Sequence, residues 1–266
     1  IATTMRSDNS ALSTVKDALG LGAATIDVAY TAMNSAIDMT KEIKNKLVAA
    51  RQPGVDRAKI QSEIDELQNQ LQSIGDSAVF SGQNWLSTDS SAVGYNATKS
   101  IVASFTRSSA GAISIGTISV DTSGTKLYDA GAAAAEVGIV DGLRDATGAI
   151  SLTGTFSVAA LDISALTDSA ADLTTLESYV AGVDASITEM TDSATTLGAT
   201  KQRVNLQKNF VSALMDAVDR GISALVDADM TEESTKLQAL QVQQQLGIQS
   251  LSIANQQGQS ILSLFR

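Results

Sequence analysis

The stretch LTTLESYVAGVDASITEMTDSATTL, residues 173–197, decides the fold, because its apolar residues return at alternating steps of three and four. This seven-residue repeat places one narrow apolar stripe along an α-helix, as in helices that wrap around each other in a coiled coil. The pattern predicts a helix that runs on to about residue 225. Its predicted core positions are Leu173, Leu176, Val180, Val183, Ile187, Met190 and Leu197.

A second repeat of the same kind lies in the N-terminal part of the chain. Within residues 57–76 the apolar positions step by four and three, which predicts another coiled-coil helix. Before it, residues 1–50 also have a helical pattern, and the only proline, Pro53, is followed by a glycine, as in a tight turn. The predicted core positions of the second repeat are Ile60, Ile64, Leu67, Leu71 and Ile74.

The closing segment contains no charged residue between Lys236 and Arg266. The acidic run before it interrupts the apolar pattern, and Asp229 with Glu232 fits a helix N-cap, so we expect a new helix to begin there. Its leucines and isoleucines lie on more than one face, and glutamine and serine separate them. Such a helix needs partners on several sides. We expect it to be buried among helices of other molecules, because amides can be hydrogen-bonded there and lone charges are costly.

The middle of the chain has another composition, rich in glycine, serine, threonine and alanine. Alternating runs at 100–108 and 112–123 predict strands or hairpins, and residues 127–146 favour a short helix among loops. We therefore predict a mainly α fold. Both terminal parts form a long antiparallel helical coiled-coil bundle, and a β-rich, loop-rich module from the middle of the chain lies at its far tip.

Composition excludes several classes of function. The chain has no histidine and no cysteine, which removes the commonest general base, thiolate nucleophiles and zinc–cysteine sites. The net charge of −11 disfavours nucleic acid. The glycines of 20–25 and the aspartates of 224–231 resemble nucleotide and phosphatase motifs, but both lie in helical surroundings. We predict no enzyme activity, no cofactor, no metal site, no nucleic-acid partner and no membrane insertion.

The two ends of the chain resemble a known family, the bacterial flagellins. The C-terminal part from LGATKQRVN, beginning at Leu197, to the terminal SILSLFR is similar to the flagellin C-terminal region. Residues 1–47 together with VFSGQNWL, residues 79–86, are similar to the N-terminal region. The sequence most resembles the flagellins of rhizobia. The opening residues read as the interior of a helix, so we expect the extreme N-terminal segment of the family to lie before residue 1.

The resemblance implies a domain organisation. Residues 1–125 would form the N-terminal part of a helical spoke domain with a β-hairpin, and 126–165 a short variable outer region. Residues 166–229 would form the C-terminal part of the spoke, and 230–266 the C-terminal helix of an inner core. The filament interface would then consist of Leu246, Ile248, Leu251, Ile253, Ile261, Leu262, Leu264 and Phe265.

The resemblance also implies a function: a structural subunit that polymerises into the extracellular helical flagellar filament used for motility. Expected partners are other copies of the chain, a flagellar export chaperone and the filament cap, with export by the flagellar type III system. Two alternatives remain open at this point. One is a hook–filament junction protein, and the other is a flagellin-like cell-surface protein that binds polysaccharide.

Overall fold

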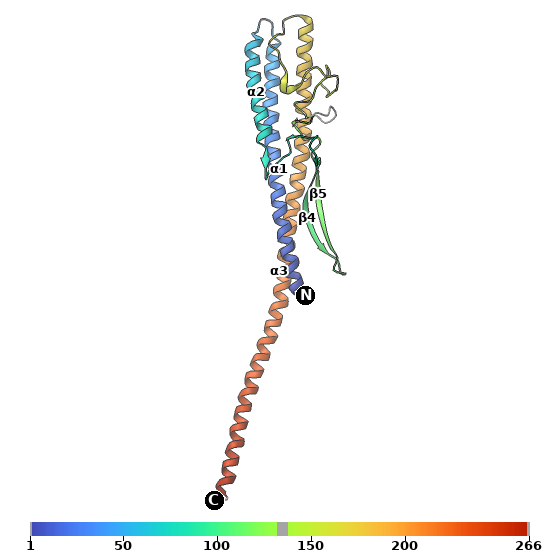
Figure 1. Ribbon diagram of the computed structural model, residues 1–266. Coiled ribbons are helices and arrows are strands. Elements are labelled where there is room, and N and C mark those ends of the chain that lie inside the picture. Colours follow the sequence, from blue (N-terminus) through green and yellow to red (C-terminus); the bar gives the residue numbers. More distant parts are fainter. Residues whose placement is uncertain (1, 132–137, 265–266) are drawn as a thin grey trace. The chain divides into compact units, whose positions relative to one another are not determined.

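The computed structural model describes residues 2–131 and 138–264, and their side chains except those of 227–229 and 256–264. The chain consists of long helices with short strands between them, which confirms the predicted mainly α class (Figure 1). It divides into two compact units. The bundle unit is Thr14–Val211, and the terminal unit is Ile1–Ser13 together with Ser212–Arg266.

Helix α1 spans Ala2–Ala50 and helix α2 spans Arg57–Ser77, as the two N-terminal patterns predict. The turn between them contains Gly54 with a positive φ of 79°, a conformation that glycine adopts without steric cost. Asp56 caps α2, because its carboxylate accepts a hydrogen bond from the backbone N–H of Lys59 at 3.3 Å. This hydrogen bond also lowers the pKa of Asp56.

Helix α3 is a single element, Ala170–Leu264. The expected helix break and new N-cap near Asp229 are therefore wrong at the level of the backbone. The stretch from Ile222 to Leu246 contains neither proline nor glycine. Every residue there can therefore continue the i to i−4 hydrogen bonds of the helix. An acidic cluster alone does not end a helix.

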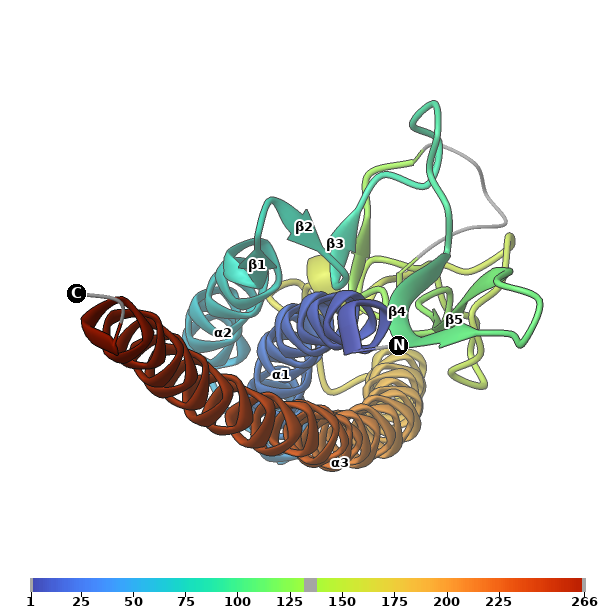
Figure 2. The same ribbon diagram turned by 90° about the horizontal axis from the view of Figure 1, so that it is seen from below.

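The three helices of the bundle unit pack side by side (Figure 2). Ion pairs show the direction of α3 relative to α1. A residue later in α1 pairs with a residue earlier in α3. Lys201 pairs with Asp27, and Lys44 pairs with Asp184 at 2.6 Å. Helices α1 and α3 are therefore antiparallel, as predicted. Lys46 of α1 and Glu63 of α2 form a further ion pair at 2.5 Å.

Many buried residues of these helices form series with a seven-residue period. One series in α3 is Leu176, Val183, Met190, Leu197, Val204 and Val211, and other buried residues of α3, such as Ala194 and Ile222, lie outside it. Helix α1 has two such series, which fits its place between α2 on one side and the β4–β5 hairpin on the other (Figure 2). The first is Leu19, Ile26, Met33, Thr40 and Leu47, and the second is Val15, Gly22, Ala29, Ala36, Ile43 and Ala50.

The middle of the chain supplies the strands. The predicted hairpin is confirmed: β4, Thr98–Arg107, pairs antiparallel with β5, Ile113–Asp121, with a bulge between Val102 and Ser104. The short strands β1, Val79–Phe80, and β2, Gln83–Asn84, form a second antiparallel pair. The remaining pair is parallel and joins β3, Ser87–Thr88, to β6, Tyr128–Asp129.

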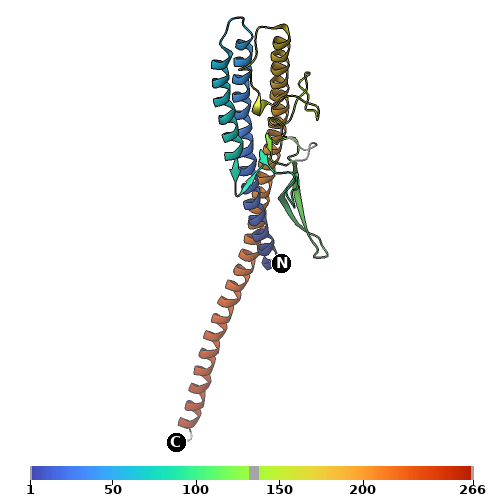
Figure 3. The same cartoon turned by 45° about the horizontal axis from the view of Figure 1, so that its top comes forward.

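The middle of the chain lies along the side of the bundle, so its expected position at the far tip is wrong (Figures 1 and 3). Gln207 of α3 donates a hydrogen bond to the carbonyl of Ala103 in β4 at 2.8 Å. The short 3-10 helix η1, Val158–Ala160, lies against α2, where Gln68 donates to the carbonyl of Val158 at 3.0 Å. A loop-rich segment buries its apolar side chains only against a surface that the helices provide.

The predicted short helix within 127–146 is not formed in the described part of that range. Residues 128 and 129 belong to β6, and residues 138–146 form turns, with two isolated bridges from Arg144, to Ile150 and to Phe156. Residues 132–137 lie outside the described residues. Aspartate and glycine recur through 138–148, and these residue types favour turns over helix.

Candidate assembly surface

The C-terminal part of α3 presents apolar side chains to solvent. Every side chain from 230 to 255 is exposed. The seven large aliphatic ones beyond Lys236 are between 53 and 67% exposed: Leu237, Leu240, Val242, Leu246, Ile248, Leu251 and Ile253. Burying one leucine or isoleucine fully is worth about 1.5–3 kcal/mol, so this helix has a large favourable free energy available from a partner.

Four of the eight predicted interface residues lie on this surface: Leu246, Ile248, Leu251 and Ile253. The side chains of Ile261, Leu262 and Leu264 and the whole of Phe265 lie outside the described part of the structure. Leu237, Leu240 and Val242 are similarly exposed, and they belong to the same apolar stripes of the sequence.

The polar residues of this surface beyond Lys236 are uncharged. From Leu237 to Phe265 the chain has glutamine, serine and asparagine, and no Asp, Glu, Lys or Arg. An amide can exchange hydrogen bonds with a neighbouring helix, whereas an unpaired charge in an interface carries a large desolvation cost. The surface beyond Lys236 can therefore be buried on several sides without burying an unpaired charge.

The terminal unit has a small packed region of its own. Ile222 of α3 is buried, and a Cβ added at Gly221 would lie 3.2 Å from the methyl group of Met5 in α1. Asn9 donates a hydrogen bond to the carboxylate of Asp219. The residues of α3 around 219–222 thus pack against the start of α1, and the run of exposed side chains begins after them.

The predicted heptad-core residues are all at least partly buried. Ile64, Leu71, Leu176, Val183, Met190 and Leu197 are buried, and Ile60, Leu67, Ile74, Leu173, Val180 and Ile187 are half-buried. Sequence reasoning missed the small residues of α1, such as Ala29 and Ala36. Alanine carries little hydropathy signal, but its strict seven-residue spacing could have revealed them.

A buried arginine ties the middle of the chain to α3. The guanidinium of Arg144 is fully buried and donates to both carboxylate oxygens of Glu189, at 2.7 and 3.2 Å. It also donates to the backbone carbonyls of Gly148 at 2.7 Å and Ile139 at 2.8 Å. Such a bidentate pair orients the loop on the helix.

A second buried ion pair joins Lys126 to Asp129 at 2.7 Å. Burial favours the neutral acid, but hydrogen bonds from Lys126, from Ser90 and from the backbone N–H of Gly131 outweigh it and lower the pKa of Asp129 to about 2. The nearby Asp141 has a raised pKa, mainly because of burial. The hydrogen bonds of these groups join parts of the loop region to one another, which is a structural role.

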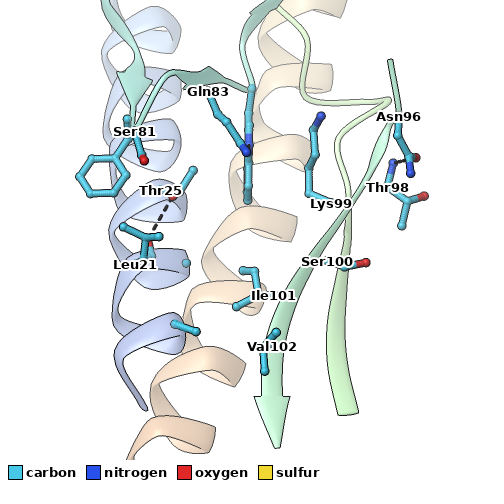
Figure 4. A pocket seen from close by; sticks show the side chains of 14 residues that line it. Leu21, Thr25, Ser81, Gln83, Asn96, Thr98, Lys99, Ser100, Ile101 and Val102 are labelled. Carbon is cyan, nitrogen blue, oxygen red and sulfur yellow. Dashed lines mark hydrogen bonds between the residues drawn. The ribbon is translucent and has the colours of Figure 1, made fainter. Parts of the chain in front are cut away.

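A pocket with a volume of about 450 Å³ lies between α1 and the start of β4, and Figure 4 shows the side chains that line it. Leu21 and Thr25 line it from α1, and Lys99 and Ile101 line it from β4. Its polar lining consists of hydroxyl, amide and indole groups and one ammonium group, without a carboxylate. That set lacks the paired acid and base that hydrolytic chemistry needs.

Two absences hold for the described residues alone. Among them no group of three or more Asp and Glu side chains is placed to hold a metal ion. None of the helices described contains an apolar stretch long enough to cross a membrane.

Comparison with known proteins gives matches at both ends of the chain. Residues 1–91 match the family model of the bacterial flagellin N-terminal helical region, and residues 180–265 match that of the C-terminal helical region. Flagellin C of Rhizobium meliloti strain 1021 is 50% identical over 235 residues, which cover 84% of this chain and 71% of that protein.

Other relatives extend this picture. Flagellin A of the same strain is 42% identical over 304 residues, covering 84% of this chain and 77% of the relative. A flagellin of Brucella melitensis biotype 1 is 39% identical over 267 residues, covering all of this chain and 83% of the relative. The resemblance seen in the two terminal sequences is thereby confirmed.

Proposed function

Because this chain belongs to the bacterial flagellin family, and is thus a structural subunit of the extracellular flagellar filament, we propose that the C-terminal part of α3 is its main assembly surface. One observation carries this proposal: the side chains from 230 to 255 are all exposed, although many are apolar and none beyond Lys236 is charged. The relatives named above are flagellins, which does not favour the junction-protein or the polysaccharide-binding alternative.

The proposed interface contains the eight residues expected from the sequence, Leu246, Ile248, Leu251, Ile253, Ile261, Leu262, Leu264 and Phe265. The apolar stripes on several faces of one helix favour contacts with several neighbours. A subunit that uses different patches against different neighbours makes heterologous contacts, and these generate an open helical filament when the rotation does not close.

The heptad seam has a different role in this proposal. The core residues from Ile60 to Ile74 and from Leu173 to Leu197 hold the helices of one subunit together, so that each copy brings a preformed bundle to the filament. We assign 1–125 and 166–229 to the helical spoke, 126–165 to a short outer region and 230–266 to the inner core. Export by the flagellar type III system, an export chaperone and the filament cap complete the proposal.

The test places one charge on the proposed interface. In cells that express the gene with Leu251→Glu, we expect little or no filament, because burying the carboxylate costs several kcal/mol. The matched control is Val93→Glu, which adds the same charge at a fully exposed position outside the interface. Filaments are sheared from the cells and quantified by peptide mass. Normal filament yield from Leu251→Glu would rule out the proposed surface.

A further inference from the structure

The pocket of Figure 4 lies within the bundle unit and has the size of a small-molecule site. Its volume of about 450 Å³ falls inside the usual range of such sites, about 300–1,000 Å³. The lining combines apolar side chains, among them Leu21, Phe80 and Ile101, with hydroxyl, amide and ammonium groups. A mainly apolar lining with a few polar groups is typical of ligand sites, and the polar groups determine which ligand suits the site.

The two amide side chains of the lining are left mainly with hydrogen-bond donors, because their oxygen atoms already accept hydrogen bonds. The Oδ1 atom of Asn96 accepts from the backbone N–H of Thr98 at 2.8 Å. The Oε1 atom of Gln83 accepts from the indole N–H of Trp85 at 3.4 Å. A side-chain amide has one oxygen and two N–H donors, so both NH₂ groups favour a ligand that accepts hydrogen bonds.

The one charged group of the pocket, the ammonium of Lys99, lies on the inner face of β4. Side chains alternate along a strand, so Lys99 shares a face with Ile101, which is buried and lies close to Gly22 of α1. The ammonium group lies 5.5 Å from the centroid of the Tyr95 ring, but no carboxylate of the described residues forms an ion pair with it. Lysines that face a protein interior are usually paired with an acid, so this position suits an anionic ligand.

The turn between β1 and β2 adds an unusual backbone conformation beside the pocket. Ser81 and Gly82 form this turn with φ values of 51° and 76°. Two positive φ values in a two-residue turn favour asparagine or aspartate before the glycine, and serine adopts such a conformation less readily. Sparsely populated conformations of this kind cluster at functional sites, and Ser81 lines the pocket.

We propose that this pocket binds a small carboxylate that carries an apolar body. The carboxylate accepts hydrogen bonds from Lys99 and from the amide groups of Gln83 and Asn96, because an ionised carboxylate is an acceptor only. The apolar body displaces water from Leu21 and Phe80. The inference is separate from the proposed function, because the lining residues lie within 18–102 and the assembly surface lies within 230–266.

Trp85 supplies a signal from the pocket itself, because it is the only tryptophan among these 266 residues and lines the pocket. Purified full-length subunits are titrated with cyclohexanecarboxylate, with its neutral analogue cyclohexanecarboxamide and with acetate, while tryptophan fluorescence is recorded. Subtracting the same titration of Trp85→Phe isolates the signal of this residue. We expect a saturable change with cyclohexanecarboxylate, at a dissociation constant at least about tenfold below that of the carboxamide or of acetate. The charged hydrogen bonds and the buried ring each account for a factor of this size.

Two variants test the polar groups. Lys99→Met removes the ammonium and keeps the aliphatic stem, and Gln83→Glu replaces an amide donor by a carboxylate at an exposed position of β2. Each should raise the dissociation constant of cyclohexanecarboxylate at least about tenfold, and Lys99→Met should leave that of the carboxamide nearly unchanged. The matched control, Lys59→Met, removes the same charge from an exposed position of α2 and should bind as the unaltered protein does.

Three results would each overturn this inference. They are the absence of a saturable signal with cyclohexanecarboxylate, equal affinity for the carboxylate and the carboxamide, and binding that neither Lys99→Met nor Gln83→Glu weakens. The second variant keeps the test valid if Lys99→Met disturbs the hairpin, because Gln83 lies outside β4 and β5.

Discussion

At the residue scale, Gly22 determines how closely the β4–β5 hairpin approaches α1. A Cβ at this position would lie 2.6 Å from Cγ2 of Ile101, which is closer than atoms can pack. The glycine-containing stretch 20–25 therefore serves packing between elements. The sequence favoured that interpretation over nucleotide binding, because helical residues surround it.

Substitution of Gly22 by alanine should destabilise the bundle unit by about 1–3 kcal/mol, because overpacking displaces Ile101. Gly20→Ala is the control, since its Cβ would lie 4.0 Å from the nearest neighbouring atom, Nζ of Lys208. That change should be neutral or slightly stabilising. Urea unfolding followed by circular dichroism measures both. Ile101→Ala combined with Gly22→Ala should recover part of the loss, and equal effects of the two glycine changes would contradict the packing argument.

The lowered pKa of Asp129 predicts that the folded protein loses stability in acid. Its folded pKa of about 2 lies below the usual value, so its contribution is present above about pH 4 and is lost as the pH falls toward 2. We expect Asp129→Asn to flatten the stability profile between these pH values, while lowering stability at pH 7. Thermal unfolding at several pH values measures this, and an unchanged acid profile would show that another group dominates.

At the element scale, the seven-residue period of α3 sets the strength of the coiled coil. Leu197→Ala should cost about 2–5 kcal/mol, because it removes a buried side chain and leaves a cavity. Thr196→Ala, at the exposed neighbouring position, should change stability by less than about 0.5 kcal/mol. Urea unfolding distinguishes them, and a similar small effect of both would mean that the seam is not the core.

Elements also show where sequence patterns are informative. Both heptad regions, the Pro53 turn and the β4–β5 hairpin follow from spacing and turn chemistry, because each depends on neighbours in the chain. The break expected near Asp229 did not follow, since polar residues are compatible with a helix when no glycine or proline intervenes. A cap residue in the sequence is therefore weak evidence for a helix end when the residues around it can all continue the helical hydrogen bonds.

At the scale of the whole molecule, the net charge of −11 opposes assembly of many identical copies. Salt shortens the range of this repulsion, from about 30 Å at 0.01 M to about 8 Å at 0.15 M. We expect subunits from depolymerised filaments to repolymerise faster at the higher salt concentration, as measured by light scattering. A rate that fell with added salt would show that attraction between charges, and not burial of apolar surface, drives assembly.

The sequence by itself determined the mainly α class, the coiled-coil seams, the uncharged C-terminal helix and the family, because these depend on periodicity and residue type along the chain. Only the tertiary structure decided that the middle of the chain lies beside the bundle, that Arg144 and Glu189 join it to α3, and that Leu206 and Phe210 remain exposed. Those features depend on contacts between residues far apart in sequence, which local pattern does not encode.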